Sequence, residues 1–373
     1  FGQSMVKSDQ HQLVDKATGS ITGHIQVQNR SIKDYKFPDR YVENPVPVEE
    51  AMRRQPGIFE FAKRITITGL VASPTTSLGS LIVAVETEKE KKITTIASHI
   101  VQGEFVGAGA RGISMGDKMA QRLDLRVGEK VVVMAQADDG SMGAEAFRLT
   151  GIYHTGSASF DGQIVYVPLA GAQELLGTGA KVNNVVARVA DMEKVDEIQQ
   201  GLAEALSREP VQVLSWKQVD FEILAIQKFQ NALLDMVLLV VFLIVALGIL
   251  NTLLMSLFER VREFGVLMAI GAKPGWILRL VLLESLCLGV MGTLFGFTVG
   301  CLLIAHFGRV GLPLPVGDAF AYFLPFPNVL FLRYAWPSHL FAGTSVLVVS
   351  ILAAIPPALR ACRLRPAEAL RHV

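Results

Sequence analysis

The sequence predicts an α/β extracytoplasmic domain of two lobes followed by an α-helical transmembrane bundle. The 373 residues are 51% hydrophobic, with a mean hydropathy of +0.40, yet 18% of them are charged. Two unlike parts make up this average, since residues 1–216 are mixed and polar whereas residues 236–359 hold three long apolar stretches. A net charge of +1 argues against a nucleic-acid partner.

Strand and helix signals alternate along residues 1–216, which predicts an α/β domain of two lobes. The strand-like runs are Ile21–Gln28, Arg64–Val71, Leu81–Glu86, Lys130–Gln136, Ala146–Tyr153, Gln163–Val167, Val185–Val189 and Val211–Trp216. The helical runs are Glu49–Gln55, Gly116–Leu123, Leu169–Leu176 and Asp191–Ser207. Asp138-Asp139-Gly140 lies between two strand signals and is typical of a hairpin tip.

Three apolar runs are each long enough to cross a bilayer. The first, residues 236–258, would cover about 35 Å at ~1.5 Å per residue, more than the hydrocarbon core requires. The second and third runs are residues 276–307 and 340–359. The second contains Glu284, a carboxylate for which we expect a structural ion pair with Arg279 or a neighbouring helix. The sequence therefore predicts three transmembrane helices.

A helical stripe of apolar residues precedes the first span. Ile226, Phe229, Leu233 and Met236 share one helical face. We predict one continuous helix from Lys217 to about Arg262, in which residues 217–235 form a stalk above the membrane. The alternative is a separate amphipathic linker.

Residues 259–275 connect the first two spans and predict a short helix lying along the membrane surface. Glu259, Arg262 and Glu263 share one helical face. The opposite face is apolar and comprises Val261, Phe264, Leu267 and Met268. Gly271 offers a left-handed stop, and Pro274 is placed to open the next helix.

The distribution of Lys and Arg predicts the orientation in the membrane. Positive residues concentrate in residues 259–279 and in the tail, residues 360–373, which we expect in the cytoplasm. Residues 1–235 and the loop of residues 308–339 would then lie outside. A folded domain of this size needs a preceding segment to deliver it across the membrane, so we expect a further transmembrane helix before Phe1 and four spans in the intact protein.

Two segments resemble FtsX-like ABC transporter permeases: residues 251–300, which begin NTLLMSLFERVREFGVLMAIGAKPG, and the ending ALRACRLRPAEALRHV. In the outer part, TGHIQVQ at residues 22–28, MGDKMAQRLDLRVGEKVVV at residues 115–133 and GIYHTGSASFDGQIVYVPL at residues 151–169 are most similar to the lipoprotein-releasing members of that family. The resemblance covers nearly the whole chain. It implies a multi-pass protein of the bacterial inner membrane with a large domain in the periplasm.

The resemblance also implies that this subunit does not hydrolyse ATP itself. No G-x-x-x-x-G-K-[ST] phosphate cradle occurs in the sequence, so we expect no cofactor in this chain and ATP with Mg²⁺ in a dimer of partner ABC ATPase subunits. The implied docking residues for that partner are Glu259, Arg262, Glu263, Phe264, Gly265, Val266 and Leu267.

Further partners follow from the same resemblance: a second permease in a homodimer or heterodimer, a lipidated protein substrate, membrane lipids and a periplasmic chaperone. The expected substrate cavity is lined by Met236, Leu239, Val240 and Leu243, for which helix packing is the alternative role. Related permeases that recruit the chaperone carry a protruding hook. The matching hairpin, Gln136–Phe147, is short and lacks proline, which puts direct chaperone capture in doubt.

The remaining motifs carry weaker signals. Gly292, Gly296 and Gly300 recur at a spacing of four, which permits close helix packing either between subunits or within one. The seven histidines lack metal-binding spacing, so no metal site is expected. Ser157 lies near His154, but the Gly-x-Ser-x-Gly elbow of hydrolases is missing and no catalytic residue is predicted.

Lipoprotein extraction from the outer leaflet of the inner membrane is the main functional hypothesis. The alternatives are a macrolide-exporter-like efflux permease and a regulatory subunit that activates a periplasmic cell-wall hydrolase.

Overall fold

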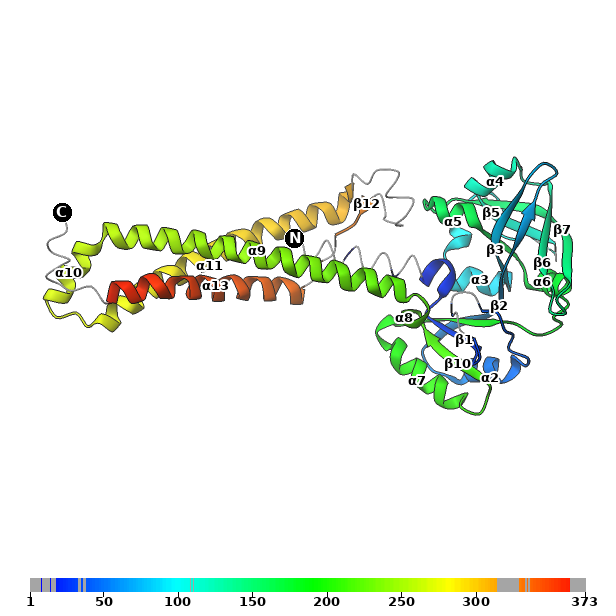
Figure 1. The fold of residues 1–373 in the computed structure, drawn as a ribbon, viewed down its shortest axis with the longest axis horizontal. Coiled ribbons are helices and arrows are strands. Elements are labelled where there is room, and N and C mark those ends of the chain that lie inside the picture. The colour runs from blue at the N-terminus through cyan, green and yellow to red at the C-terminus, as the bar shows by residue number, and fades with distance from the viewer. Residues whose placement is uncertain are drawn as a thin grey trace. The chain divides into compact units, whose positions relative to one another are not determined.

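The computed structural model describes residues 18–32, 38–107, 111–313, 329–332 and 336–362, together with residues 8, 14, 35, 109 and 334. These divide into two compact units. The α/β unit holds the described residues from Val14 to Ala225, and the helical unit holds those from Ile226 onward together with Ser8. The two units are coloured blue to green and green to red in Figure 1.

One connected sheet of ten strands forms the framework of the α/β unit (Figure 1). The strands are β1 Ile25–Asn29, β2 Ile58–Ala72, β3 Ser77–Val85, β4 Ile100–Gly103, β5 Gly112–Gly116, β6 Lys130–Gln136, β7 Met142–Tyr153, β8 Ile164–Pro168, β9 Asn184–Val189 and β10 Val211–Ser215. Their order is β10-β1-β9-β2-β3-β8-β5-β7-β4, and β6 pairs with both β2 and β7. The pairs β3–β8 and β5–β7 are parallel and the others are antiparallel.

The long strand β2 joins two groups of strands that correspond to the two predicted lobes. Residues 58–64 of β2 pair with β9, whereas residues 64–72 pair with β3 and residues 69–72 also pair with β6. Gly69 makes this branching possible, because a Cβ there would lie 2.5 Å from the carbonyl oxygen of Met134. One large apolar cluster extends through both groups and makes the lobes continuous with each other, and the described part of the unit also holds two smaller clusters.

Helices cover the sheet and supply much of this core. They are α2 Val46–Arg54, α3 Thr87–Ile93, α4 Asp117–Leu123, α5 Ala158–Gln163, α6 Leu169–Leu176, α7 Val195–Ala205 and α8 Trp216–Val219. The apolar side chains Val195, Ile198 and Leu202 of α7 are buried, as is Leu206 just after it, while Ala205 at its end is exposed. A π-helical turn occupies Thr18–Thr22, at the start of the run that the sequence assigns to a strand.

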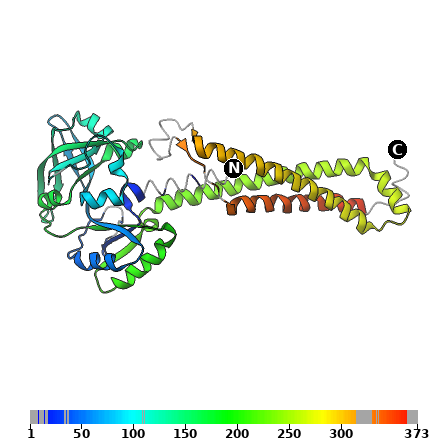
Figure 2. The same ribbon diagram turned by 180° about the vertical axis from the view of Figure 1, so that it is seen from behind.

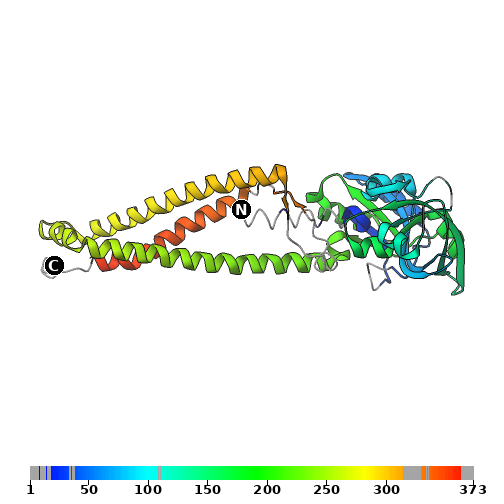
Figure 3. The same cartoon turned by 90° about the horizontal axis from the view of Figure 1, so that it is seen from above.

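The helical unit contains most of α9 Phe221–Glu259, whose first residues up to Ala225 belong to the α/β unit, together with α10 Val261–Ala269, α11 Pro274–Val310 and α13 Trp336–Cys362. It also has a short two-stranded pairing of β11 Leu312–Pro313 and β12 Val329–Leu330. Figures 2 and 3 show the long helices extending from the end of the unit that holds α10. Among the described residues, three helices are long and apolar enough to cross a membrane: Phe221–Glu259, Pro274–Val310 and His339–Cys362. Each includes one of the predicted spans.

The predicted single helix from Lys217 to Arg262 is wrong at both ends. Asp220, with φ −103° and ψ 51°, separates α8 from α9. Arg260, with φ −108° and ψ 13°, separates α9 from α10. Both residues make contacts across the fold that local periodicity does not reveal, and the helix between them has 39 residues.

Helices α11 and α13 pack through small side chains. The Ser285 hydroxyl donates to the carbonyl oxygen of Ser350 at 2.8 Å, and both residues are buried. Gly289 lies one turn further along α11, where a Cβ would be 3.0 Å from Ser350 Oγ. The absence of a side chain at Gly289 therefore lets the two helices approach closely.

Candidate functional site

The short helix α10 is anchored by its apolar face to the ends of the spans. Phe264 is buried in a cluster with Leu257 of α9, Ile277 of α11 and Ala358 of α13. Val261 is also buried, whereas Leu267 and Met268 are partly buried, as the predicted apolar face requires. The cluster therefore connects α10 to all three long helices.

The opposite face of α10 is open and charged. Arg262 and Glu263 are exposed on this face, and Val266 is 45% exposed. Glu259 is also exposed, but it is the last residue of α9 and precedes the break at Arg260. We call these four residues the charged ridge. Among the seven predicted docking residues, Phe264 and Gly265 are buried, and Phe264 packs against α11 and α13. Leu267 is intermediate between the two faces.

Arg260 organises the junction between α9 and α10 and was missed in the sequence. Its Nε donates to Glu263 Oε2 at 3.1 Å, and its Nη1 lies 3.6 Å from Glu284 Oε2 on α11. Its guanidinium also lies 5.3 Å from the centre of the Phe264 ring, within cation–π range. Glu284 is therefore paired from a neighbouring helix, one of the two structural roles expected for it.

Glycine and proline define the end of α10. Gly271 has φ +103°, and its N–H donates to the carbonyl oxygen of Met268 at 3.1 Å. The N–H of Ala272 donates to the carbonyl oxygen of Leu267 at 2.9 Å, which completes a Schellman stop. Pro274 then opens α11. Both sequence expectations for this turn are confirmed.

At its other end, α9 begins beside a buried polar junction in the α/β unit. The hydroxyl of Thr22 donates to the Asp220 carboxylate, and both residues are buried. Next to Thr22, the carbonyl oxygen of Ile21 accepts from the guanidinium of Arg64, which also pairs with Glu90. The Arg64 and Glu90 side chains are 1% and 0% exposed. This chain of contacts ties the first turn of α9 to the sheet.

The predicted cavity face of α9 is exposed along its length. Met236, Leu239, Val240 and Leu243 have exposed fractions between 47% and 68%. None of the residues in the most apolar part of α9 is buried by the described chain. This face is therefore available to lipid, cargo or another helix.

The predicted glycine stripe on α11 does not contact the described part of this chain. A Cβ added at Gly292, Gly296 or Gly300 would have no heavy atom within 4 Å. The close packing of α11 on α13 instead uses Gly289. Much of the outer loop, residues 314–328, and the tail from residue 363 lie outside the described residues.

A group of metal-ligand types in the α/β unit was also missed in the sequence. His154 Nδ1 lies 3.1 Å from Asp117 Oδ2 and 3.5 Å from Asp161 Oδ2. Burial raises the pKa of the Asp161 carboxyl, and hydrogen bonds from Thr155 offset part of that rise. The expectation of no metal site considered only the spacing of histidines, which could not indicate the approach of Asp117 from another element.

The arrangement defines a class of protein: a membrane permease with a large α/β domain and a short helix that joins its spans. Comparison with known proteins gives the family. The MacB-like periplasmic core domain matches residues 1–205, more than half of the chain, and the FtsX-like permease C-terminal domain matches residues 236–366. The chain belongs to the family of FtsX-like permeases with a MacB-like periplasmic core domain, and it is an ABC transporter permease of this type.

Individual relatives are distant. The lipoprotein-releasing system transmembrane protein LolC of Neisseria meningitidis is 22% identical over 97% of this chain and 86% of its own length. The macrolide export ATP-binding/permease protein MacB of Hyphomonas neptunium is 25% identical over 71% of this chain and 38% of its own length. The solved periplasmic region of MacB from Actinobacillus actinomycetemcomitans aligns with 57% of this chain and 97% of that one, at 10% identity and a TM-score of 0.40.

Proposed function

We propose that the chain is the permease subunit of a lipoprotein-releasing ABC transporter in the bacterial inner membrane, with the α/β unit in the periplasm. The alignment with LolC over nearly the whole chain supports the cargo class. The observation that carries the mechanism is the position of α10, whose apolar face is buried against the spans while its charged ridge is open. Such a helix can receive a push from a soluble partner and pass it to the spans.

The partner is a dimer of ABC ATPase subunits that binds ATP and Mg²⁺. Glu259, Arg262 and Glu263 would meet complementary charges on that subunit, which sets the register of docking. Phe264 would hold α10 to α11 and α13 as the ATPase closes. Packed apolar clusters move as units because their interiors have little free space, so the displacement reaches the spans.

Helix α9 provides the route from the spans to the α/β unit. Its 39 residues extend about 58 Å at ~1.5 Å per residue, which exceeds the ~30 Å hydrocarbon core. Its first turn follows the Asp220–Thr22 contact, so a shift of the helix would pull on a buried network and not on a free linker. The residues before the span then act as the predicted stalk.

The exposed face of α9 at Met236, Leu239, Val240 and Leu243 would meet the acyl chains of the cargo within a dimer of permeases. A chaperone would receive the cargo outside. The β6–β7 turn is short, and its Asp139 side chain accepts hydrogen bonds from Ser141 N and Oγ. This compact tip does not offer an extended hook, so handover would use another surface or the second permease.

Reversing two charges on the ridge tests the docking assignment. Arg262→Glu combined with Glu263→Arg should abolish copurification of the ATPase while the α/β unit stays folded, because the ridge then presents the opposite pattern. The matched control reverses the exposed pair Glu50 and Arg54 on α2, whose side chains lie 3.1 Å apart. Equal ATPase recovery from both variants would refute docking on α10.

The cargo is tested by purifying the full-length transporter and analysing what it carries. A bound triacylated protein supports lipoprotein release. The likeness to MacB makes macrolide export the second candidate, and macrolide-stimulated ATP hydrolysis without bound lipoprotein would favour it. A copurified cell-wall hydrolase would favour the regulatory alternative.

A further inference from the structure

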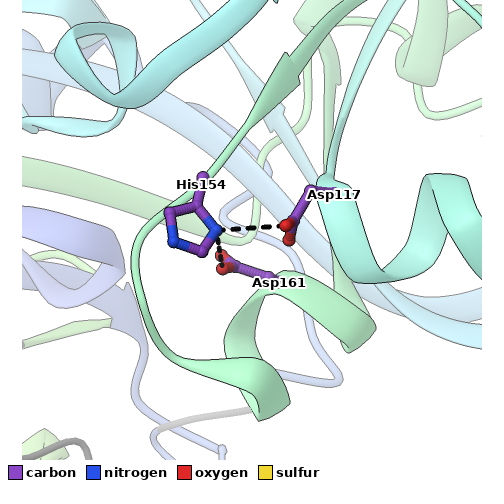
Figure 4. Close-up of side chains that lie close together, drawn as sticks. All are labelled: Asp117, His154 and Asp161. Atoms are coloured by element: carbon purple, nitrogen blue, oxygen red, sulfur yellow. Dashed lines mark hydrogen bonds and ion pairs between the residues drawn. The ribbon is translucent and has the colours of Figure 1, made fainter.

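Asp117, His154 and Asp161 converge in the α/β unit from three separate elements (Figure 4). Asp117 is the first residue of α4, His154 directly follows β7, and Asp161 belongs to α5. One ligand atom from each residue lies within 4.8 Å of the other two. Figure 4 shows the same nitrogen of the imidazole facing both carboxylates.

The backbone is shaped to allow this convergence. Gly116 precedes Asp117, and a Cβ at Gly116 would lie 2.2 Å from the carbonyl oxygen of Asp161. Any other residue at position 116 would therefore force α5 away from the start of α4. The close approach of the two aspartates depends on this glycine.

Hydrogen bonds from Thr155 fix the orientation of the Asp161 carboxylate. Its side chain is 1% exposed, and Thr155 donates to it from the backbone N–H at 3.1 Å and from the hydroxyl at 2.7 Å. Hydrogen bonds of this kind orient carboxylates that bind metal ions. The His154 side chain is 50% exposed, so the cluster can be reached from solvent.

Within the described chain, the negative charges of the Asp117 and Asp161 carboxylates are only partly balanced. His154 Nδ1 can donate one proton and faces both Asp117 and Asp161. Neither aspartate forms an ion pair with Lys or Arg among the described residues. The buried atom Asp117 Oδ1 also has no hydrogen-bond partner there. A buried acceptor left without a partner is unfavourable, and a cation at the cluster would also offset the repulsion between the two carboxylates.

We propose that Asp117, His154 and Asp161 bind a divalent transition-metal cation of the Zn²⁺ class. Zn²⁺ binds imidazole nitrogen and carboxylate oxygen at about 2.0–2.2 Å, which separates neighbouring ligands of a tetrahedral ion by about 3.3 Å. The observed separations of 3.1 and 3.5 Å match that spacing. One nitrogen and two oxygen donors suit Zn²⁺ better than a soft ion such as Cu(I).

The bound ion would join α4, α5 and the end of β7. These elements come from different parts of the sequence, so the metal would act as a cross-link that stabilises the α/β unit. Three protein ligands leave a fourth position open to water or to a donor from a partner protein. The site is independent of the transport cargo proposed above.

The test is ZnCl₂ binding to the full-length protein in detergent after treatment with a chelator, with MgCl₂ as the comparison salt. We expect one Zn²⁺ per chain and a rise in the unfolding temperature of the α/β unit, while MgCl₂ has a weaker effect. Asp117→Asn and His154→Gln should each reduce the affinity at least 10-fold. Thr155→Val, which removes one hydrogen bond to Asp161, should reduce it about 10–100-fold.

His99→Gln is the matched control, because His99 lies beside the cluster but its Nδ1 contacts the carbonyl oxygen of Thr95. Its carbonyl oxygen accepts the backbone N–H of His154. Zinc affinity should be unchanged in this variant. No zinc-dependent shift in the native protein, or an equal shift in His154→Gln, would overturn the proposal and leave a histidine held between two carboxylates.

Discussion

In the α/β unit the large side chains Tyr153, Tyr166 and Phe147 are no more than 2% exposed, whereas on α9 the large side chains Met236 and Phe258 are each 68% exposed. The first unit buries its apolar surface within itself. The helical unit places much of its apolar surface outside, where lipid or another helix can cover it. Matched substitutions in the two units should therefore have unequal consequences.

The largest difference between the two units is expected in the free energy of unfolding lost when one partner of an ion pair is removed. Arg64→Met leaves Glu90 buried without its partner and should lower the free energy of unfolding of the α/β unit by about 3–5 kcal/mol. Arg260→Met breaks the pairs with Glu263 and Glu284, whose side chains are 66% and 37% exposed, and should cost no more than about 1 kcal/mol. Urea unfolding followed by proteolysis measures both. Equal losses would show that the two pairs have similar surroundings.

A double substitution sharpens this result. Arg64→Met combined with Glu90→Leu removes both buried charges, so it should recover most of the stability lost in the single variant. If the double variant is as unstable as the single one, the loss comes from packing or from the Ile21 contact and not from an unpaired charge.

Leucine truncation gives the next largest contrast. Leu149→Ala on β7 removes a fully buried side chain and should cost about 2–5 kcal/mol. Leu243→Ala on α9 removes a side chain that is 56% exposed, and the stability of the chain should hardly change. Thermal unfolding in detergent compares the two variants. A large loss for Leu243→Ala would mean that α9 is packed against protein.

The smallest difference in stability is expected between valine substitutions at two glycines of α11. Gly289→Val crowds Ser350 and should destabilise the packing of α11 on α13 by about 1–3 kcal/mol. Gly292→Val meets open space and gains the same helix propensity, so it should be neutral or stabilising in the isolated chain.

The same two substitutions, at Gly289 and Gly292, also test whether α11 contacts a second permease. If α11 contacts a second permease at the stripe of Gly292, Gly296 and Gly300, Gly292→Val should weaken subunit association on size-exclusion chromatography while Gly289→Val leaves it intact. If Gly292→Val instead leaves association intact while Gly289→Val weakens it, the glycine stripe faces lipid.

Local sequence signals were sufficient where neighbouring residues determine the structure. Leu169–Leu176 and Lys130–Gln136 were predicted with the bounds that the structure has. The stop at Gly271 and the helix start at Pro274 were also predicted, because their backbone preferences are intrinsic. The three apolar helices follow from length and composition alone.

Long-range contacts determine what the sequence could not indicate. The short helix Thr87–Ile93 has a polar sequence, and it is stabilised in part by the buried pairing of Glu90 with Arg64. The break at Asp220 depends on Thr22, nearly two hundred residues away in sequence. Arg260 and Asp117 were missed for the same reason, since each acquires its partners only when distant elements meet.

Transmission from the cytosol to the periplasm is tested most directly by distance measurements in the assembled transporter. One spin label would be placed at the exposed residue Val101 in each of the two permeases of the dimer. The distance between the labels would be measured with the ATPase free of nucleotide and again with its cycle trapped by ATP and vanadate. We expect the separation to change on trapping, and the change to disappear when Arg262 and Glu263 are reversed. An unchanged separation, with the ATPase shown to be docked and trapped, would contradict transmission through α10 and α9.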